Sequence, residues 1–240
     1  MSKEMPGFEQ ILTILKKTSL FNGIDDAMLE EIVHLSTLTH LQKKSVIFSS
    51  DTKDKVFIIL SGRAKLSSIN PDIGREYVVS LLEPGDAFDL ISWLGGTDDG
   101  LIVEAIDDLQ LLSAPITIAR SWVDMYPQFN KQLFPYLGKR MRSIKKTSES
   151  LALYDTTTRL ARLIVTYIDN NALPNDAGLI PIRLINDLPH EILAQMIGSA
   201  RKVVNQNLQT LKKEGIIASV DGRLFVKDLD RLVLKSKMEL

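Results

Sequence analysis

The chain has 240 residues, of which 45% are hydrophobic and 25% charged, a composition typical of a soluble globular protein with one large or two ordinary domains. It contains no cysteine, which excludes disulfides, thiolate nucleophiles and cysteine-ligated iron–sulfur clusters. No apolar run approaches the ~18 residues of a membrane span, and the first ten residues lack a signal-peptide pattern. We therefore expect a cytoplasmic protein with no membrane partner.

The net charge of −1 hides an uneven distribution along the chain. Residues 1–118 carry 10 Lys and Arg against 18 Asp and Glu, whereas residues 119–237 carry 19 against 11. The two halves therefore have net charges of −8 and +8. An acidic half joined to a basic half indicates that only the second half meets a polyanion such as DNA.

Two short helices are expected first, over residues 8–17 and 25–36. From about residue 38 the pattern changes to short runs rich in Val, Ile and Phe, which recur every ten or so residues between turn residues. This spacing predicts a β-sandwich or jelly roll of roughly 75 residues. The expected strands are 45–50, 55–62, 63–69, 77–82, 101–106 and 109–115.

A long helix is expected after about residue 118, with Pro127 in its first turn and a kink near Pro135 and Gly138. Its apolar residues are spaced by three or four and flanked by Lys and Arg, a pattern typical of a two-stranded coiled coil. A helix packed on its own domain is the alternative. Leu133 begins the stripe, and the predicted dimer contacts are Leu137, Met141, Ile144, Ser148 and Leu151.

Residues 189–213 have the pattern of two short helices joined at Gly198, with Ser199 expected to cap the second helix. The outward face of the second helix carries no acidic residue and is rich in side chains that recognise base edges, since Arg pairs with guanine and Asn or Gln with adenine. The alternative is an ordinary helical hairpin with a polar surface. The predicted DNA contacts here are Ser199, Arg201, Lys202, Asn205 and Gln206.

Two short strands are expected within residues 214–232, around the hairpin turn formed by Asp221 and Gly222. A helix-turn-helix followed by a β-hairpin is a winged helix. Arg223 at the tip of this wing is the sixth predicted DNA contact. The predicted organisation is a sensing jelly-roll domain with N-terminal helices (1–118), a dimerisation helix (119–154) and a winged-helix DNA-binding domain (155–240).

Five blocks of the chain, in matching order and spacing, resemble the CRP/FNR family of bacterial transcription regulators. They are LFNGIDDAMLEEI (20–32), VFIILSGRAKL (56–66), LLEPGDAF (81–88), LALYDTTTRLARLI (151–164) and LAQMIGSARKVVNQNLQTLKKEGII (193–217). The resemblance implies an α+β protein with a cyclic-nucleotide-binding-type jelly roll, a long dimerising helix and a C-terminal winged helix. It further implies a homodimer that binds an inverted repeat in double-stranded DNA and contacts RNA polymerase.

The chain departs from the cAMP-binding members of that family at the residues that hold the nucleotide. Asp99 and Gly100 stand where an Arg-Ser pair binds the cyclic phosphate, and a carboxylate there repels a phosphate. Ile144 and Lys145 stand where a Thr-Ser pair meets the adenine. We therefore predict control by a signal other than cAMP, or by none.

Other effectors stay open at this level. Haem is possible in principle because His34, His40 or a Met could ligate iron, although a lone His is more often part of ordinary packing. An apolar effector pocket is hypothesised from Phe88, Asp89, Leu90, Trp93 and Ile144, with ordinary core packing as the alternative.

Two other classes of function fit the sequence less well than a DNA-binding regulator does. A ligand-sensing adaptor, whose helix-turn-helix contacts a protein, would fit the acidic first half but not the basic second half. An enzyme is not expected, because the sequence offers no nucleophile–base pattern, phosphate loop or clustered metal ligands.

Overall fold

The computed structural model describes residues 7–48, 54–95, 100–169 and 173–237. The chain forms two compact units, Met1–Arg142 and Ser143–Leu240. The division falls within the long helix α5 (Pro127–Leu153) and so differs from both expected borders, at 118 and 154. The functional division into 1–118, 119–154 and 155–240 stays a prediction.

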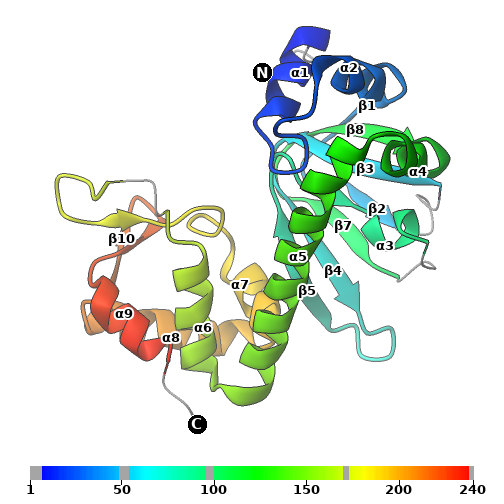
Figure 1. Ribbon diagram of the computed structural model, residues 1–240. Coiled ribbons are helices and arrows are strands. Elements are labelled where there is room, and N and C mark those ends of the chain that lie inside the picture. Colours follow the sequence, from blue (N-terminus) through cyan, green and yellow to red (C-terminus); the bar gives the residue numbers. More distant parts are fainter. Residues whose placement is uncertain (1–6, 49–53, 96–99, 170–172, 238–240) are drawn as a thin grey trace. The chain divides into compact units, whose positions relative to one another are not determined.

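The first unit contains two four-stranded antiparallel sheets, as the sequence predicts for a jelly roll (Figure 1). One sheet has the order β1 (Thr37–Leu41), β8 (Leu109–Pro115), β3 (Lys55–Ser61), β6 (Ala87–Phe88). The other has the order β2 (Val46–Phe48), β7 (Ile102–Ala105), β4 (Ala64–Ile69), β5 (Glu76–Leu82). The six expected strands are confirmed over their described residues, since residues 49 and 50 of the strand expected at 45–50 lie outside the described part of the chain. Strands β1 and the two-residue β6 lie outside the expected strands.

The two faces of the first sheet bury different apolar clusters, because alternate side chains of a strand point to opposite sides. Phe57 and Ile59 of β3 join Val103 of β7 and Leu109 of β8 in a cluster drawn from both sheets. Val56, Ile58 and Leu60 of β3 instead face a helical layer. One strand thus supports two cores, which explains why its run VFIIL is buried throughout.

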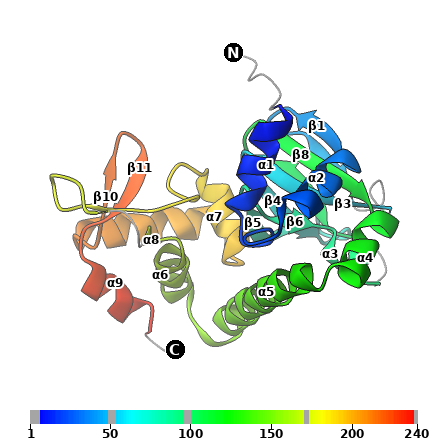
Figure 2. The ribbon, with the colours of Figure 1, turned by 45° about the horizontal axis from the view of Figure 1, so that its top comes forward.

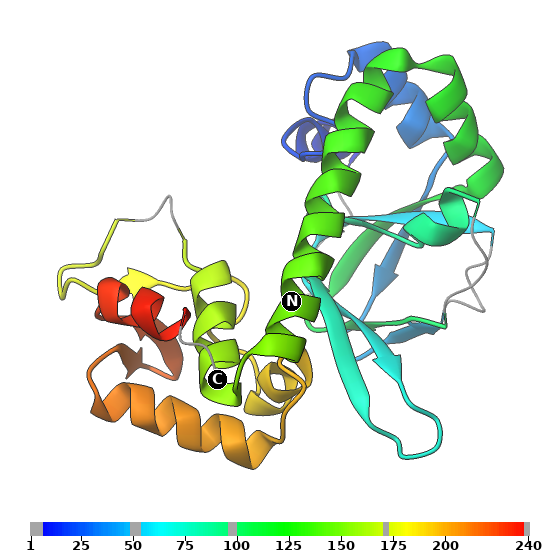
Figure 3. The ribbon, with the colours of Figure 1, turned by 60° about the horizontal axis from the view of Figure 1, so that its bottom comes forward.

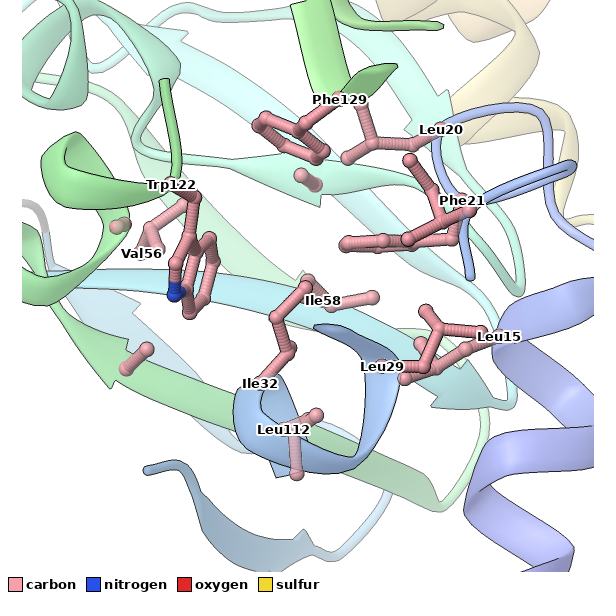
Figure 4. Packing of buried hydrophobic residues seen from close by; sticks show 14 of the residues in the cluster. Leu15, Leu20, Phe21, Leu29, Ile32, Val56, Ile58, Leu112, Trp122 and Phe129 are labelled. Carbon is pink, nitrogen blue, oxygen red and sulfur yellow. The ribbon is translucent and has the colours of Figure 1, made fainter. Parts of the chain in front are cut away.

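The helical layer is formed by α1 (Phe8–Lys16), α2 (Asp26–His34), α4 (Ile116–Met125) and the beginning of α5 (Figure 2). Asp25 caps α2 by accepting a hydrogen bond from the Met28 N–H at 2.9 Å. Trp122 and Phe129 pack edge to face at 6.2 Å in the middle of this cluster (Figure 4). The expected helices at 8–17 and 25–36 are confirmed within two residues at each end.

A buried lysine joins three strands of the second sheet. Lys65 of β4 is 5% exposed, and its Nζ lies 2.8 Å from a Glu76 carboxylate oxygen of β5 and 3.0 Å from one of Glu104 of β7. Burial alone would lower the pKa of Lys65, but hydrogen bonds and charge interactions with the two glutamates outweigh it and raise the pKa. The cluster therefore stabilises the sheet only while Lys65 keeps its proton.

This arrangement predicts a loss of stability at alkaline pH. The pKa of Lys65 is about 10.4 in the unfolded chain and higher in the folded chain. The contribution of Lys65 to the free energy of unfolding is therefore complete below about pH 10.4, and it declines as the pH rises through the pKa of the folded chain. Burial also raises the pKa of Tyr77, which acts in the same direction. Urea unfolding midpoints should change little up to about pH 10 and should fall as the pH rises above that value. Lys65→Arg, which keeps the charge without titrating in this range, should fall less steeply; an equal slope would contradict the role of Lys65.

The second unit begins within α5 and continues through α6 (Thr156–Thr166) and a strand, β9 (Ile180–Pro181). Asp155 caps α6 by accepting from the Thr158 N–H at 2.7 Å. A helix pair and a hairpin follow: α7 (His190–Met196), α8 (Arg201–Lys213), β10 (Ile217–Val220) and β11 (Arg223–Val226). The chain then forms α9 (Leu229–Lys235), which packs against α6.

Helix α5 continues through Pro135. Pro127 is its first residue, as expected, and Leu153 its last, one residue short of the expected end. No described helix is both long and apolar enough to cross a lipid bilayer.

Candidate nucleic-acid interface

Helices α7 and α8 are joined by a tight turn at Gly198. This glycine has a φ of +62°, a conformation that favours residues without a Cβ. A Cβ at Gly198 would also lie 3.0 Å from the Leu151 Cδ2 atom, near the end of α5. The backbone angle therefore favours glycine at this position, and the close approach places the turn against Leu151.

The cap of α8 differs from the sequence prediction. Ala200, not Ser199, is the N-cap residue, and no side chain caps the helix. The Ser199 N–H instead donates to the Ala194 carbonyl at 2.9 Å and closes the turn. The helix starts one residue later because the left-handed Gly198 needs one more residue to redirect the chain. The expected capping role of Ser199 is therefore wrong, while its contact with DNA stays a prediction.

A second link holds the turn in place. Arg159 of α6 donates from Nε to the Tyr154 carbonyl and from Nη1 to the Ile197 carbonyl, both at 2.9 Å. Ile197 is the C-cap residue of α7, so one guanidinium fixes the turn to the start of α6. No local pattern in the sequence indicates this role, because an Arg in an amphipathic helix gives no sign of its distant partner.

The faces of α8 separate as the sequence predicts. Val204, Leu208 and Leu211 are buried, whereas Arg201, Lys202 and Gln206 are exposed. Asn205 is half-buried, at the border between the two faces. Figure 3 shows α8, in orange, along the outer edge of the second unit. The described residues of α8 include no acidic side chain, so the outward face suits a polyanion.

The hairpin after α8 is a wing with a tight turn. Strands β10 and β11 pair antiparallel, with Val220 opposite Arg223. Asp221 and Gly222 between them both have positive φ, at 49° and 77°, as in the hairpin turns that an Asp-Gly pair favours. Arg223 is exposed beside this turn. Strand β9 adds a third strand by pairing with β11, which the sequence analysis did not predict.

Models of two protein families match the chain in tandem. A cyclic nucleotide-binding domain matches residues 38–122, and a Crp-like helix-turn-helix domain matches residues 158–234. Together they cover more than half of the chain, in the order that the jelly roll and the winged helix require. The chain belongs to the CRP/FNR family. It is a DNA-binding transcription regulator of the CRP/FNR type, with the fold expected from the sequence.

Relatives of known function agree with this family assignment. A CRP-like cAMP-activated global transcriptional regulator of Mycobacterium tuberculosis is 24% identical over 225 residues, which cover 93% of this chain and 99% of that regulator. A global nitrogen regulator of Synechocystis is 26% identical over 187 residues, covering 77% and 81% of the two chains. Both relatives are regulators by name.

A solved structure confirms the fold. A mutant of CooA from Carboxydothermus hydrogenoformans has a TM-score of 0.74 and 25% sequence identity, covering 86% of this chain and 90% of that one. A regulator assigned to the same family from Eubacterium rectale has a TM-score of 0.65 at 19% identity, covering 91% and 98%.

The hypothesised effector residues do not share one environment. Phe88 stacks on Phe57 at 4.7 Å in the cluster between the sheets, whereas Trp93 packs edge to face on Trp122 at 6.4 Å in the cluster under the helices. Asp89 precedes α3 (Leu90–Trp93) with a left-handed φ of 60°. Ile144 belongs to the second unit, and Asp99 lies outside the described residues. The packing of Phe88 and Trp93 accounts for their burial, and a pocket at these residues stays a prediction.

A polar cluster connects the turn before this segment to α5. The Tyr136 hydroxyl of α5 accepts hydrogen bonds from the Ala87 N–H at 3.0 Å and from Arg140 Nε at 3.2 Å. Arg140 Nη2 lies 2.9 Å from a carboxylate oxygen of Asp86. Tyr136 is buried, and burial raises the pKa of its hydroxyl. The cluster fixes the early part of α5 to the strand that carries Ala87 and Phe88.

Removing one oxygen tests this connection. Tyr136→Phe should lower the free energy of unfolding by about 1–3 kcal/mol, because it leaves the buried Ala87 N–H without its acceptor while keeping the ring. Urea unfolding of the purified protein measures the loss. Phe48→Tyr, which adds a hydroxyl at an exposed position of β2, is the control and should change stability little. A Tyr136→Phe variant as stable as the parent would show that the hydroxyl contributes nothing.

The predicted dimer contacts lie on α5 as a heptad pattern, with one correction. Leu133, the expected start of the stripe, is fully buried in the helical core of the first unit, whereas Phe134 is 63% exposed. Met141 and Ile144 are 71% and 54% exposed. We call the α5 seam the set with alternating spacings of three and four residues, namely Phe134, Leu137, Met141, Ile144, Ser148 and Leu151.

Proposed function

We propose that the protein acts in the cytoplasm as a homodimer that binds an inverted repeat in double-stranded DNA through α8 and the wing. It is controlled by a signal other than cAMP, or by none, and it is not an enzyme. The observation that carries the proposal is the exposed face of α8, with Arg201, Lys202 and Gln206, in a unit that also carries a wing with Arg223. A recognition helix in the major groove contacts bases mainly with its N-terminal residues. Ser199 and Asn205 complete the proposed contacts.

The α5 seam supports the homodimer. Phe134, Met141 and Ile144 expose large apolar side chains of one helix at heptad spacing, and such a stripe is buried when two copies form a coiled coil. Leu137 also packs on the core of the first unit, and Leu151 also packs on the Gly198 turn. These two seam residues would therefore contact both the partner copy and the rest of their own chain. A dimer presents two recognition helices to two half-sites.

The residues at the positions where cAMP-binding members of the family hold the nucleotide support control by a signal other than cAMP. Ile144 and Lys145 offer no hydroxyl to an adenine, and Lys145 pairs with Glu149 at 3.4 Å. Apolar side chains from both sheets pack into the cluster between them. His34 packs its ring on Phe8 at 4.7 Å, which accounts for its position without iron. RNA polymerase remains a proposed partner by family resemblance.

A selection experiment tests the proposal. Purified protein is mixed with fragmented genomic DNA, first alone, then with cAMP, then with metabolites extracted from cells, and bound fragments are sequenced. We expect an inverted repeat with half-sites one helical turn apart, found without cAMP. Enrichment only with extract would establish another effector, and enrichment that depends on cAMP would contradict the proposed signal. No enrichment under any condition would favour an adaptor that binds protein.

A further inference from the structure

A side-chain contact joins the two helices of the helix-turn-helix at its DNA-facing side. His190 is the first residue of α7, and Asn205 lies in the second turn of α8. The Nδ1 atom of His190 contacts the Oδ1 atom of Asn205. An amide oxygen can only accept a hydrogen bond, so Nδ1 carries the hydrogen and donates it. The contact fixes which end of the Asn205 amide turns towards α7.

The position of Asn205 places its amide next to the other proposed base contact. Asn205 follows Arg201 by four residues, so the two side chains are neighbours on the surface of α8. Arg201 is exposed, while Asn205 is half-buried and borders the buried Leu208 and Val204. The row that contains Arg201 and Asn205 is therefore the side of α8 that adjoins α7.

The contact changes the base that Asn205 can recognise. A free Asn pairs with adenine through two bonds, its oxygen accepting from N6 and its nitrogen donating to N7. In this structure the Oδ1 atom is turned towards His190 of α7, so the opposite end of the amide is the Nδ2 group, which only donates. The acceptors that suit this donor best are O6 and N7 of guanine and O4 of thymine, because the N7 of adenine, which also accepts, lies beside an N6 donor that then has no acceptor on Asn205.

We propose that His190 is a positioning residue that turns the donor end of the Asn205 amide towards DNA, so that Asn205 prefers guanine or thymine to adenine at the base pair it contacts. This inference rests on the proposed function, since it assigns one specificity within the same DNA interface. The sequence analysis expected Asn205 to face outward as an adenine reader and assigned no role to His190, because their contact depends on the packing of α7 against α8.

Two substitutions of His190 separate positioning from a direct phosphate contact. In His190→Asn an amide nitrogen occupies the place of Nδ1, so the hydrogen bond to Asn205 can persist. In His190→Gln an amide nitrogen occupies the place of Nε2, so a contact from that side to DNA can persist while the bond to Asn205 is lost. Positioning predicts that His190→Asn keeps the base preference and His190→Gln loses it.

A third substitution tests the donor itself. Asn205→Asp has the same shape and can still accept from His190, but it has no hydrogen to donate. It should lose the preference for guanine or thymine and shift towards cytosine, whose N4 group donates in the major groove. If Asn205 only joins the two helices, Asn205→Asp should keep the parent's base preference. This variant keeps the α7–α8 contact, so the test does not depend on a variant that fails to fold.

The measurement is the affinity of each protein for operators that carry each of the four bases at every position of one half-site, at one fixed salt concentration. We expect the parent and His190→Asn to prefer guanine or thymine by about fivefold to tenfold at one base pair, and His190→Gln and Asn205→Asp to lose that preference there alone. A preference for adenine at the pair sensitive to Asn205, or equal profiles for all four proteins, would overturn the inference. A parent protein that selects no inverted repeat would overturn the proposed function, and this inference with it.

Discussion

Replacing Ile144 with glutamate is expected to convert the protein into monomers and to weaken its binding to a two-half-site operator by about 100-fold or more. Ile144 is 54% exposed at the centre of the α5 seam, three residues after Met141, which is 71% exposed. In a coiled-coil dimer the two copies of position 144 face each other, so the substitution places two carboxylates in an apolar contact. A monomer keeps its recognition helix but loses the second half-site.

The measurement combines sedimentation velocity, which gives the mass in solution, with titration of a labelled operator. Lys146→Gln changes the net charge by the same amount, at an exposed position of the same helix off the α5 seam, and should remain a dimer with nearly the parent's affinity. Dimers of the Ile144→Glu variant would contradict the coiled coil. Monomers that still bind the operator at the parent's affinity would contradict the need for two half-sites.

Replacing Arg201 with alanine is expected to cost about 1–3 kcal/mol of operator binding and to relax the preference at one base pair. Arg201 is exposed as the first residue of α8, and a guanidinium can form two hydrogen bonds with O6 and N7 of guanine. Losing such a pair costs affinity for the correct base much more than for the other three. The variant's binding to unrelated DNA should therefore stay close to the parent's.

Arg223→Ala is the matched comparison, because it removes the same side chain from the tip of the wing. It should weaken binding about equally on all sequences and lower the salt dependence by about one phosphate contact. Binding of both variants is measured on the selected operator, on operators with single base changes and on unrelated DNA, over a series of salt concentrations. A uniform loss for Arg201→Ala would instead assign Arg201 to a phosphate.

The DNA interface has some features that the sequence alone could predict and others that it could not. The spacing around Gly198 and the Asp221-Gly222 turn predicted the helix pair and the wing, because a left-handed turn and a two-residue hairpin each demand particular residues. The pattern also predicted the buried and exposed faces of α8. It could not predict the Arg159 link to the Ile197 carbonyl or the contact between His190 and Asn205, because each joins residues whose distance depends on how separate helices pack.

The sequence by itself determined most of the helices and strands, although not β1, β6 or β9, and which kind of regulator they form, since periodicity and turn chemistry are local properties of the chain. Only the tertiary structure decided between neighbours with equal local preferences. Leu133 and Phe134 are both apolar residues of α5, yet one fills the core beneath the helix and the other is exposed on the α5 seam. Phe88 and Trp93, close in sequence, pack into different clusters because successive elements point their side chains to opposite faces of one sheet. Such choices depend on the partner surface, which no local pattern contains.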